Sequence, residues 1–315
     1  MKKVLITGAA GNIGINVIKY LLAEGKYDIT AIDLPNKYVY NRLRKYRKRI
    51  NIIYGDILDG NTVYEIIKDQ DFIIHLASCL PPLADLKEKL ANTIEVNGTE
   101  NIVRAINYCN KKCMLIYASS TSVYGVNSPV NVELKTNPIG FYSVAKVKAE
   151  EVITKHLKNY AILRMSLVIG DLVNTKIIYN IPSDEMIECI SSEDAAYAIV
   201  KCLDKKDAVN KKVLNIGGGD NCAVLFKDLK KMILTYHGIN LNNTVQSMFI
   251  SKNYHSPVLI DSIESNKILD YQNDSFESIS MKVKRRSKKR VINRLFGKLF
   301  AQKKKKGGKK WLDWL

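Results

Sequence analysis

The sequence predicts an α/β fold built on a doubly wound parallel sheet, and two observations support this prediction. Short apolar segments with the length of buried strands alternate with segments whose apolar residues recur at helical spacing throughout the first half of the chain. Such alternation is typical of βαβ units, in which helices cover both faces of a parallel sheet. The chain also has 315 residues, 46% of them hydrophobic, which is enough to bury a substantial core.

The first βαβ unit is expected at the start of the chain. Residues 3–7 form a short apolar segment that runs directly into the glycine-rich turn Gly8-Ala9-Ala10-Gly11-Asn12-Ile13-Gly14. From Asn12 onward, apolar residues recur at helical spacing as far as Gly25, which predicts a helix after the turn. A second strand is expected at residues 28–32.

The remaining elements follow the same alternation. Strands are expected at residues 50–54, 72–76, 113–118 and 161–165, with helices at 63–68, 83–108 and 141–156. No run of 18 or more apolar residues occurs, so no membrane-spanning helix is expected. The apolar segment after Lys3 is too short for a secretory signal and is accounted for by the first strand.

The glycine-rich turn predicts a dinucleotide site of the Rossmann type. Glycines between a strand and a helix let the backbone approach a pyrophosphate, whose charge is held by N–H groups and by the positive end of the helix. Asp33 follows the second strand about 20 residues beyond the glycines, where a ribose 2′-hydroxyl is bound. Asp33 would repel a 2′-phosphate, and no basic residue follows it until Lys37. We therefore expect NAD rather than NADP.

Tyr142 and Lys146 form a candidate acid–base pair. A spacing of four residues is just over one helical turn, so both side chains project from the same face of a helix. A phenol has an ordinary pKa near ~10, and a neighbouring ammonium stabilises the phenolate. Lowering this pKa to about 7 requires roughly 4 kcal/mol of differential stabilisation.

The cysteines and histidines do not predict a metal site. The six cysteines are scattered without paired metal-ligand spacing, which favours reduced, buried thiols. His75 lies at the end of an apolar strand, where we expect a core or cofactor-edge imidazole rather than a catalytic one.

Six segments occur in the order found in one enzyme family. They are Gly8-Ala9-Ala10-Gly11-Asn12-Ile13-Gly14, Gly55-Asp56-Ile57, His75-Leu76-Ala77, Val96-Asn97-Gly98-Thr99, Ala118-Ser119-Ser120-Thr121-Ser122-Val123-Tyr124-Gly125 and Tyr142-xxx-Lys146. The chain thus resembles the extended short-chain dehydrogenases/reductases (SDR), and within them the NAD-dependent epimerase/dehydratase family, best known for nucleotide-sugar enzymes. The resemblance covers roughly residues 1–280 and thins after about residue 170.

The resemblance implies a set of cofactor contacts. The turn residues, Asn12 and Ile13 above all, would meet the pyrophosphate, and Asn97 would support the active-site helix and its bound groups. The full set is Gly8, Gly11, Asn12, Ile13 and Gly14 at the pyrophosphate, Asp33 at the ribose, Asp56 and Ile57 at the adenine, Leu76, Ala77 and Ser78 at the nicotinamide, and Asn97, Tyr142 and Lys146.

The resemblance also implies the catalytic residues Ser120, Tyr142 and Lys146. Ser120 would hydrogen-bond the reacting hydroxyl and orient it toward Tyr142. Lys146 would lower the pKa of Tyr142 and bind the nicotinamide ribose. No metal is implied.

Departures from the family pattern narrow the expected reaction. Sugar-nucleotide 4,6-dehydratases carry an Asp-Glu pair directly after the catalytic Thr, where this chain has Thr121 and Ser122. Related decarboxylases keep a Glu where Ser122 stands. Elimination and decarboxylation need such acid and base groups, so epimerisation or simple alcohol/ketone redox chemistry fits better.

A second departure concerns the substrate. Nucleotide-sugar epimerases usually have an Asn three residues after the Arg of the sixth strand, where it helps hold the diphosphate, but Leu167 follows Arg164 here. The segment 171–188 is also shorter than the usual substrate-binding insertion. We expect a Rossmann domain at 1–170, a small substrate lobe with segments returning to the core at 171–281, and a tail at 282–315.

The expected tail is basic and amphipathic. Residues 282–315 contain 15 Lys and Arg and one acidic residue, which gives +14 of the formal net charge of +18. Apolar residues of 291–300 share one side of a helical wheel, and Trp311 and Trp314 follow as candidate headgroup anchors. We rank an anionic membrane surface first as the partner of the tail, docking on the enzyme or on another protein second, and nucleic acid third.

Three hypotheses about function remain. The first is a cytoplasmic NAD-dependent epimerase or dehydrogenase acting on a nucleotide-activated sugar, held at the inner face of a membrane where surface glycans are assembled. The second keeps the chemistry but has a non-sugar alcohol or ketone as substrate. The third is a catalytically silent dinucleotide-binding protein with a membrane- or RNA-binding tail, against which the intact Ser120, Tyr142 and Lys146 argue. The resemblance further implies a homodimer through the helices expected at 83–108 and 141–156.

Overall fold

A seven-stranded parallel sheet forms the centre of the molecule, as the sequence predicts. The computed structural model describes residues 1–81, 83–126, 129–170, 183–236 and 259–286. The strands are β1 (Lys2–Thr7), β2 (Tyr27–Asp33), β3 (Asn51–Tyr54), β4 (Phe72–His75), β5 (Met114–Ser120), β6 (Tyr160–Met165) and β9 (Lys212–Ile216). Their order is β3-β2-β1-β4-β5-β6-β9, which is that of a doubly wound Rossmann-type sheet extended at one edge.

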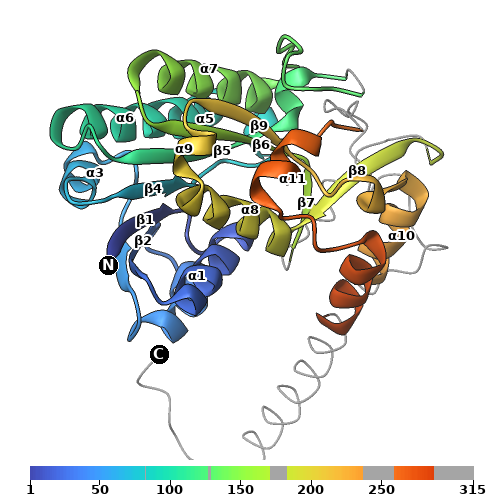
Figure 1. Cartoon of the computed structure of the whole chain (residues 1–315), viewed down its shortest axis with the longest axis horizontal. Coiled ribbons are helices and arrows are strands. Elements are labelled where there is room, and N and C mark those ends of the chain that lie inside the picture. Colours follow the sequence, from blue (N-terminus) through green and yellow to red (C-terminus); the bar gives the residue numbers. More distant parts are fainter. Residues whose placement is uncertain (82, 127–128, 171–182, 237–258, 287–315) are drawn as a thin grey trace, which may run out of the picture.

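Helices cover both faces of this sheet (Figure 1). One face is packed by α1 (Asn12–Glu24), α2 (Lys37–Leu43) and α8 (Ser192–Asp204). The other is packed by α3 (Gly60–Ile67), α6 (Gly98–Cys109) and α7 (Phe141–His156). The shorter helices are α4 (Leu83–Leu86), α5 (Glu88–Asn92), α9 (Lys206–Val209) and α11 (Ile263–Leu269), with 3-10 turns at Arg44–Tyr46, Thr121–Tyr124 and Asp220–Cys222.

The helix expected at residues 83–108 is interrupted twice. Lys87, between α4 and α5, has a non-helical backbone (φ −136°, ψ 83°). Residues Thr93–Asn97 then form a π turn between α5 and α6. A π turn inserts an extra residue into the helical repeat, so it changes which side chains face the neighbouring helices. Apolar periodicity alone does not reveal such a turn.

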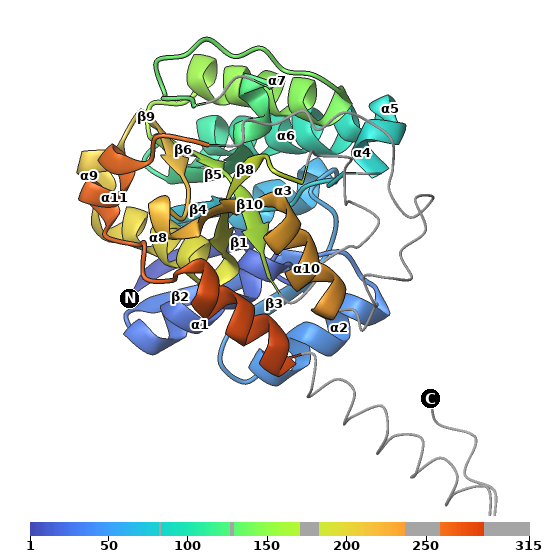
Figure 2. The same ribbon diagram turned by 90° about the vertical axis from the view of Figure 1, so that its right-hand side faces the viewer.

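A second, smaller sheet lies beside the carboxyl ends of the central strands. It consists of β7 (Leu167–Ile169), β8 (Met186–Ser191) and β10 (Ala223–Leu225), with β8 in the middle. Helix α10 (Phe226–Tyr236) and a helix at residues 276–286 pack on it and lie side by side (Figure 2). Between β8 and β10 the chain returns to the central sheet through α8 and β9.

The helix at 276–286 crosses residue 282, where the sequence predicts that the tail begins. Val283 is buried in the lobe, the Lys282 Nζ lies 2.6 Å from Asp274 Oδ1, and Arg286 pairs with Glu193. The basic tail thus begins with residues packed on the lobe. Residues 287–315, including the expected amphipathic segment and both tryptophans, lie outside the described residues. Among the helices of the described ranges, none is both long enough and apolar enough to cross a bilayer.

Candidate active site

The glycine-rich turn brings backbone close to the end of β4. Gly8 has a φ of +64°, and a Cβ there would lie 2.7 Å from the Ala77 nitrogen. A Cβ at Gly14 would lie 2.6 Å from the Ala9 carbonyl oxygen. The close approach expected of these positions is therefore present, and larger residues would push the turn, β4 and α1 apart.

The amino end of α1 keeps its positive potential. Gly11 is the N-cap, no side chain caps the helix, and its first turn, which holds Asn12 and Ile13, contains no acidic residue. Asp33 lies beside this turn, because its Oδ2 accepts a hydrogen bond from the Ala10 N–H at 2.8 Å. An uncapped helix end next to a carboxylate is suited to a pyrophosphate followed by a ribose hydroxyl. The residues present therefore fit a dinucleotide.

Arg42 is a cation at this turn that sequence reasoning missed. It lies on α2, its guanidinium packs over the Tyr38 ring at 5.4 Å, and its Nη2 donates to the Gly11 carbonyl at 3.4 Å. Within the described residues its buried Nε has no hydrogen-bond partner. Only the packing of α2, which the strand and helix pattern did not predict, brings Arg42 back to the turn.

The other expected cofactor residues follow the carboxyl ends of β3 and β4, on the same side of the sheet as the turn. Asp56 is exposed and accepts the Leu58 N–H, whereas Ile57 is buried beneath α6. Leu76 and Ala77 donate their N–H groups to Thr7 Oγ1 at 3.2 and 3.1 Å, which fixes the end of β4 beside the turn. Ser78 follows them toward α7.

Ser120, Tyr142 and Lys146 are brought together as expected. Ser120 ends β5, and Tyr142 and Lys146 lie one turn apart on α7. The Tyr142 phenol is hydrogen-bonded with Ser78 and Ser120, and the Lys146 Nζ lies 5.8 Å from the centre of the Tyr142 ring. The Lys146 ammonium also donates to the Ala118 carbonyl at 2.8 Å.

The expected lowering of the Tyr142 pKa is not found. Burial raises the pKa of Tyr142 above its ordinary value, and the Glu95 carboxylate raises it further, while the hydrogen bonds with Ser78 and Ser120 act in the opposite direction. Burial by itself would lower the pKa of Lys146, but the interactions with Glu95 and Tyr117 together outweigh burial, so this pKa is also raised. Lys146 is thus a fully charged ammonium whose charge is compensated by a carboxylate, and Tyr142 is a neutral phenol.

That carboxylate belongs to Glu95, which the sequence analysis did not single out. Its Oε2 lies 2.9 Å from the Lys146 Nζ, and its Oε1 accepts from the Ser78 hydroxyl at 2.5 Å and from the Cys79 N–H at 2.8 Å. Asn97, the residue expected to support the active-site helix, is instead exposed. Glu95, two residues earlier in the same π turn, takes the buried position beside Lys146, and the cofactor contact of Asn97 stays a prediction.

A buried ion pair joins the elements that carry the catalytic candidates. Arg164 of β6 donates to both oxygens of Glu150 of α7, from Nε at 3.0 Å and from Nη2 at 2.6 Å. Ser119 of β5 donates to the same carboxylate at 2.5 Å, and the guanidinium lies 4.8 Å from the centre of the Tyr124 ring. The network therefore fixes the end of β5 against α7.

Three residues depart from the family pattern, namely Thr121, Ser122 and Leu167, and the structure shows the surroundings of each. Thr121 is buried, and Ser122 has a buried hydroxyl for which the described ranges contain no hydrogen-bond partner. Leu167 is in β7 and packs against the apolar core of the small lobe. Neither Thr121 nor Ser122 has a carboxylate that could supply the acid and base groups of the dehydratases.

His75 is a core residue, as expected. Its Nδ1 and Nε2 pair with the hydroxyls of Thr7 at 2.7 Å and Thr99 at 3.2 Å. Burial lowers its pKa from 6.5 to about 3, with a further contribution from the charge of Lys146. His75 is therefore neutral at neutral pH.

This pKa predicts a pH dependence of stability with a known sign. Between about pH 6.5 and 3 the unfolded chain binds a proton that folded His75 does not, so the free energy of unfolding falls as the pH falls through this range. The slope reaches up to about 1.4 kcal/mol per pH unit. Urea denaturation at pH 7 and 5 should show a flatter slope for His75→Gln than for the parent. The exposed His156→Gln is the matched control, and an equal slope in all three proteins would refute the assignment.

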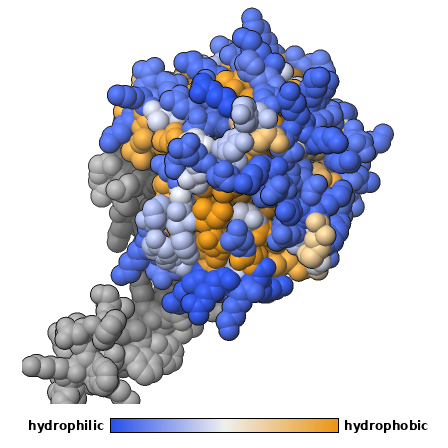
Figure 3. Space-filling view, turned by 90° about the vertical axis from the view of Figure 1, so that its left-hand side faces the viewer, coloured by the Kyte–Doolittle hydropathy of each residue, from blue (hydrophilic) through white to orange (hydrophobic). Residues whose placement is uncertain are grey.

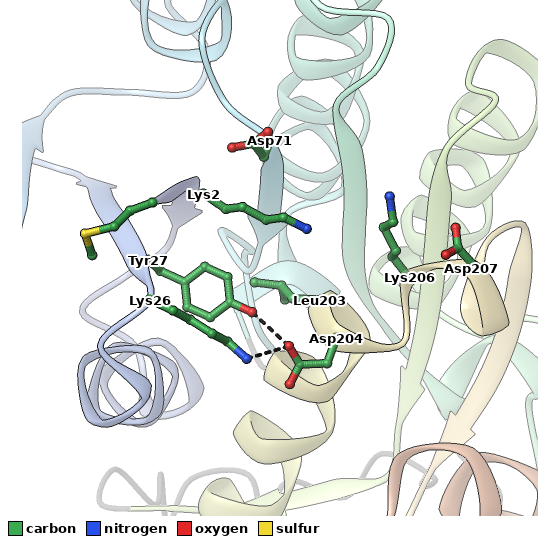
Figure 4. Close-up of a pocket in the computed structure, with 9 residues that line it drawn as sticks. Lys2, Lys26, Tyr27, Asp71, Leu203, Asp204, Lys206 and Asp207 are labelled. Carbon is green, nitrogen blue, oxygen red and sulfur yellow. Dashed lines mark hydrogen bonds and ion pairs between the residues drawn. The ribbon is translucent and has the colours of Figure 1, made fainter.

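A separate pocket lies at the other end of the central strands, next to their amino ends (Figure 4). This side of the molecule is mostly hydrophilic, with a hydrophobic patch near its centre (Figure 3). In the pocket, Asp204 accepts hydrogen bonds from Lys26 at 2.7 Å and from Tyr27 at 3.2 Å. Ligands of parallel α/β sheets bind at the carboxyl ends instead, and these charges already neutralise each other, so we assign this pocket no role.

The chain is similar in sequence to known nucleotide-binding enzymes of one family. Residues 4–217 match the family model described as the NAD dependent epimerase/dehydratase family. The chain is 27% identical over 283 residues to the bifunctional polymyxin resistance protein ArnA of Wigglesworthia glossinidia brevipalpis, and the match covers 77% of this chain and 42% of that protein. It is 28% identical over 262 residues to the UDP-N-acetyl-alpha-D-glucosaminuronate decarboxylase of Bacillus cytotoxicus, covering 71% of this chain and 77% of that protein.

Solved structures show the same fold. A dTDP-glucose 4,6-dehydratase from Bacillus anthracis in complex with NAD has a TM-score of 0.77 at 19% identity, covering 92% of this chain and 97% of that chain. A UDP-glucuronic acid 4-epimerase from Bacillus cereus, in complex with UDP-glucuronic acid and NAD, has a TM-score of 0.72 at 22% identity, covering 91% and 98%.

Proposed function

The chain belongs to the NAD-dependent epimerase/dehydratase family, and on this premise we propose that it is an epimerase or dehydrogenase acting on a nucleotide-activated sugar. The observation that carries the proposal is the meeting of Ser120, Tyr142 and Lys146 at the carboxyl end of the sheet, beside a turn that fits a dinucleotide. The UDP-N-acetyl-alpha-D-glucosaminuronate decarboxylase and the UDP-glucuronic acid 4-epimerase are named for nucleotide sugars, which supports this substrate class.

Each side chain has a role that its position supports. NAD, when bound, supplies hydride-accepting and hydride-donating chemistry. Ser120 hydrogen-bonds the reacting hydroxyl and orients it, and Tyr142 exchanges the hydroxyl proton. Lys146 anchors the site through Ala118 and Glu95. In epimerisation, Tyr142 returns the proton after the ketone has turned its other face, whereas a dehydrogenase stops after the first half.

Redox chemistry without elimination fits the surroundings of Ser120 best. A dehydratase or decarboxylase needs a further carboxyl group near the substrate, and Thr121 and Ser122 cannot supply one. The Ser122 hydroxyl, which has no hydrogen-bond partner among the residues that the structure describes, is instead suited to a neutral hydrogen bond with a sugar hydroxyl.

A second candidate is favoured by Leu167. Its side chain packs in the core of the lobe, so it cannot hold a diphosphate as the family's Asn does. A non-sugar alcohol or ketone would not need that contact.

Turnover assays separate these candidates. The purified chain is incubated with NAD and a panel of UDP-, dTDP- and GDP-sugars, followed by NADH absorbance and by NMR of product stereochemistry. A changed hydroxyl configuration without net NADH supports epimerisation, and NADH accumulation supports a dehydrogenase. No turnover of any sugar, with NAD bound, would reject the first proposal, and a parallel panel of small alcohols and ketones tests the second.

We also propose that the basic tail holds the enzyme at the inner face of a membrane. Its pattern combines many cations with an apolar helical face and two tryptophans, the two signals that reversible anchoring requires. Each basic residue near an anionic surface contributes about 1 kcal/mol.

Deletion after Arg286 tests this anchor without disturbing the packed helix at 276–286. The truncated chain should keep NAD binding but fall to background in sedimentation with phosphatidylglycerol vesicles, because the deletion removes the apolar helical face, both tryptophans and 11 of the 15 cations. Full-length protein carrying Trp311→Ala and Trp314→Ala keeps the charge and should bind with intermediate strength. Equal sedimentation of the truncated and full-length chains would reject the anchor.

The same reasoning extends to assembly. We propose a homodimer through α6 and α7, which share an exposed face that includes Tyr108, 81% exposed. Light scattering of the full chain measures the mass directly, and Tyr108→Glu should shift it toward the monomer.

A further inference from the structure

Glu95 is a buried carboxylate whose contacts connect both candidate catalytic side chains. Its side chain is 0% exposed and that of Lys146 is 2% exposed, and the two form an ion pair of 2.9 Å. The other carboxylate oxygen accepts a hydrogen bond from the Ser78 hydroxyl. The same hydroxyl is also hydrogen-bonded with the Tyr142 phenol. Glu95 therefore touches the lysine directly and the tyrosine through one serine.

We propose that Glu95 is a positioning residue of the acid–base unit, which holds Lys146 in place and cancels its charge so that Tyr142 rests as a neutral proton donor. This inference rests on the proposed role of Tyr142 in proton transfer. It assigns the resting site to the protonated state, which is the state needed to reduce a ketone. Oxidation of an alcohol then requires Tyr142 to lose its proton against the field of Glu95.

Charge cancellation follows from the geometry of the pair. An ammonium alone would stabilise a phenolate one turn away, because Coulomb interactions are strong in a poorly solvated interior. A carboxylate within 2.9 Å of that ammonium makes the net charge of the pair zero. Lys146 is further held by the Ala118 carbonyl at 2.8 Å and by the Tyr117 ring at 4.7 Å. The ammonium is thus bound by several protein groups and cannot favour the phenolate strongly.

The other titratable groups around Tyr142 do not reverse this effect. Asp85, next to α7, accepts the Tyr142 N–H at 3.3 Å and also raises the pKa of the phenol. His75 of β4 is neutral, burial raises the pKa of Tyr117 of β5, and burial raises that of the Cys79 thiol.

Glu95 does not replace the carboxylate that dehydratases and decarboxylases use. Its side chain is sealed behind Ser78 and Lys146, with none of its surface exposed to solvent. It therefore acts through other residues rather than by touching substrate.

Ultraviolet titration of Tyr142 tests the proposal without any sugar substrate. The chain contains 17 tyrosines, so the phenolate absorbance of each protein is compared with that of the same protein carrying Tyr142→Phe, both saturated with NAD. We expect Glu95→Gln to lower the midpoint of Tyr142 ionisation by at least about one pH unit, and Glu95→Asp, which keeps the charge, to stay near the parent. Glu100→Gln is the matched control, because Glu100 pairs with Arg104 at the same 2.9 Å but at an exposed site. An unchanged or raised midpoint in Glu95→Gln would overturn the proposal.

Two further comparisons keep the test decisive if Glu95→Gln does not fold or if the proposed function is wrong. If Glu95→Gln does not fold, Lys146→Met is compared with Lys146→Met/Glu95→Gln, in which no buried charge of the pair is left alone. The midpoint should be lower in the double variant, and equal midpoints would refute the role of Glu95. A shifted titration with no turnover of any sugar would retain this inference and reject the proposed function. With turnover, the pH at which alcohol oxidation rises should shift down in Glu95→Gln together with the titration.

Discussion

Tyr142→Phe should lower kcat by about 10²- to 10⁴-fold, the range that a positioned acid–base group contributes. The substitution removes only the hydroxyl, and the ring keeps its place in the buried cluster with Ala145 and Cys79. NAD binding should persist, because the turn at Gly8–Gly14 and Asp33 does not depend on this hydroxyl. The measurement is the initial rate with the substrate identified by the panel, together with the Kd for NAD from calorimetry.

A matched control separates chemistry from packing. Tyr108→Phe removes the same atom from an exposed tyrosine on α6 and should leave kcat unchanged. Turnover by Tyr142→Phe at the rate of the parent would contradict the assigned proton transfer. A large loss of NAD binding would instead show that the phenol has a structural role in the cofactor site.

The sequence carried most information where the physical rule is local. The glycine-rich turn needs small residues because a Cβ at Gly8 or Gly14 would overlap neighbouring backbone, and the structure shows these close approaches. The strands of the central sheet are rich in apolar residues, because both faces of a parallel sheet are covered. Tyr142 and Lys146 share a helix face because they are four residues apart, which is just over one helical turn. These features were predicted and are present.

The features that the sequence did not reveal depend on packing between distant elements. Only Asn97 was singled out from the segment Thr93–Asn97, whereas the π turn formed by this segment places Glu95 in the buried position. Arg42 reaches the glycine-rich turn only because α2 folds back toward it. The Tyr142 pKa was expected to fall because only Lys146 was visible as its neighbour, whereas the effect of Glu95 required the three-dimensional contact.

The buried ion pair that supports the site also depends on contacts between distant elements. Arg164, Glu150 and Ser119 are far apart in sequence, and none of their spacings predicts a contact. In the structure they form a buried network that links β5, β6 and α7, and α7 carries Tyr142 and Lys146. The relative position of Ser120 and Tyr142 therefore depends on residues that take no part in proton transfer.

Arg164→Met should lower the free energy of unfolding by about 3–5 kcal/mol, because it leaves the Glu150 carboxylate buried without its cation. Lys68→Met is the matched control: Lys68 pairs with Glu65 at the same 2.6 Å as Arg164 with Glu150, but both Lys68 and Glu65 are exposed. An exposed pair contributes about 0–1 kcal/mol, so this variant should unfold close to the parent in urea. Adding Glu150→Gln to Arg164→Met removes the unpaired charge and should restore part of the loss. If Arg164→Met and Lys68→Met cost the same, burial would not decide the strength of the pair, and the network could not be what fixes β5 against α7.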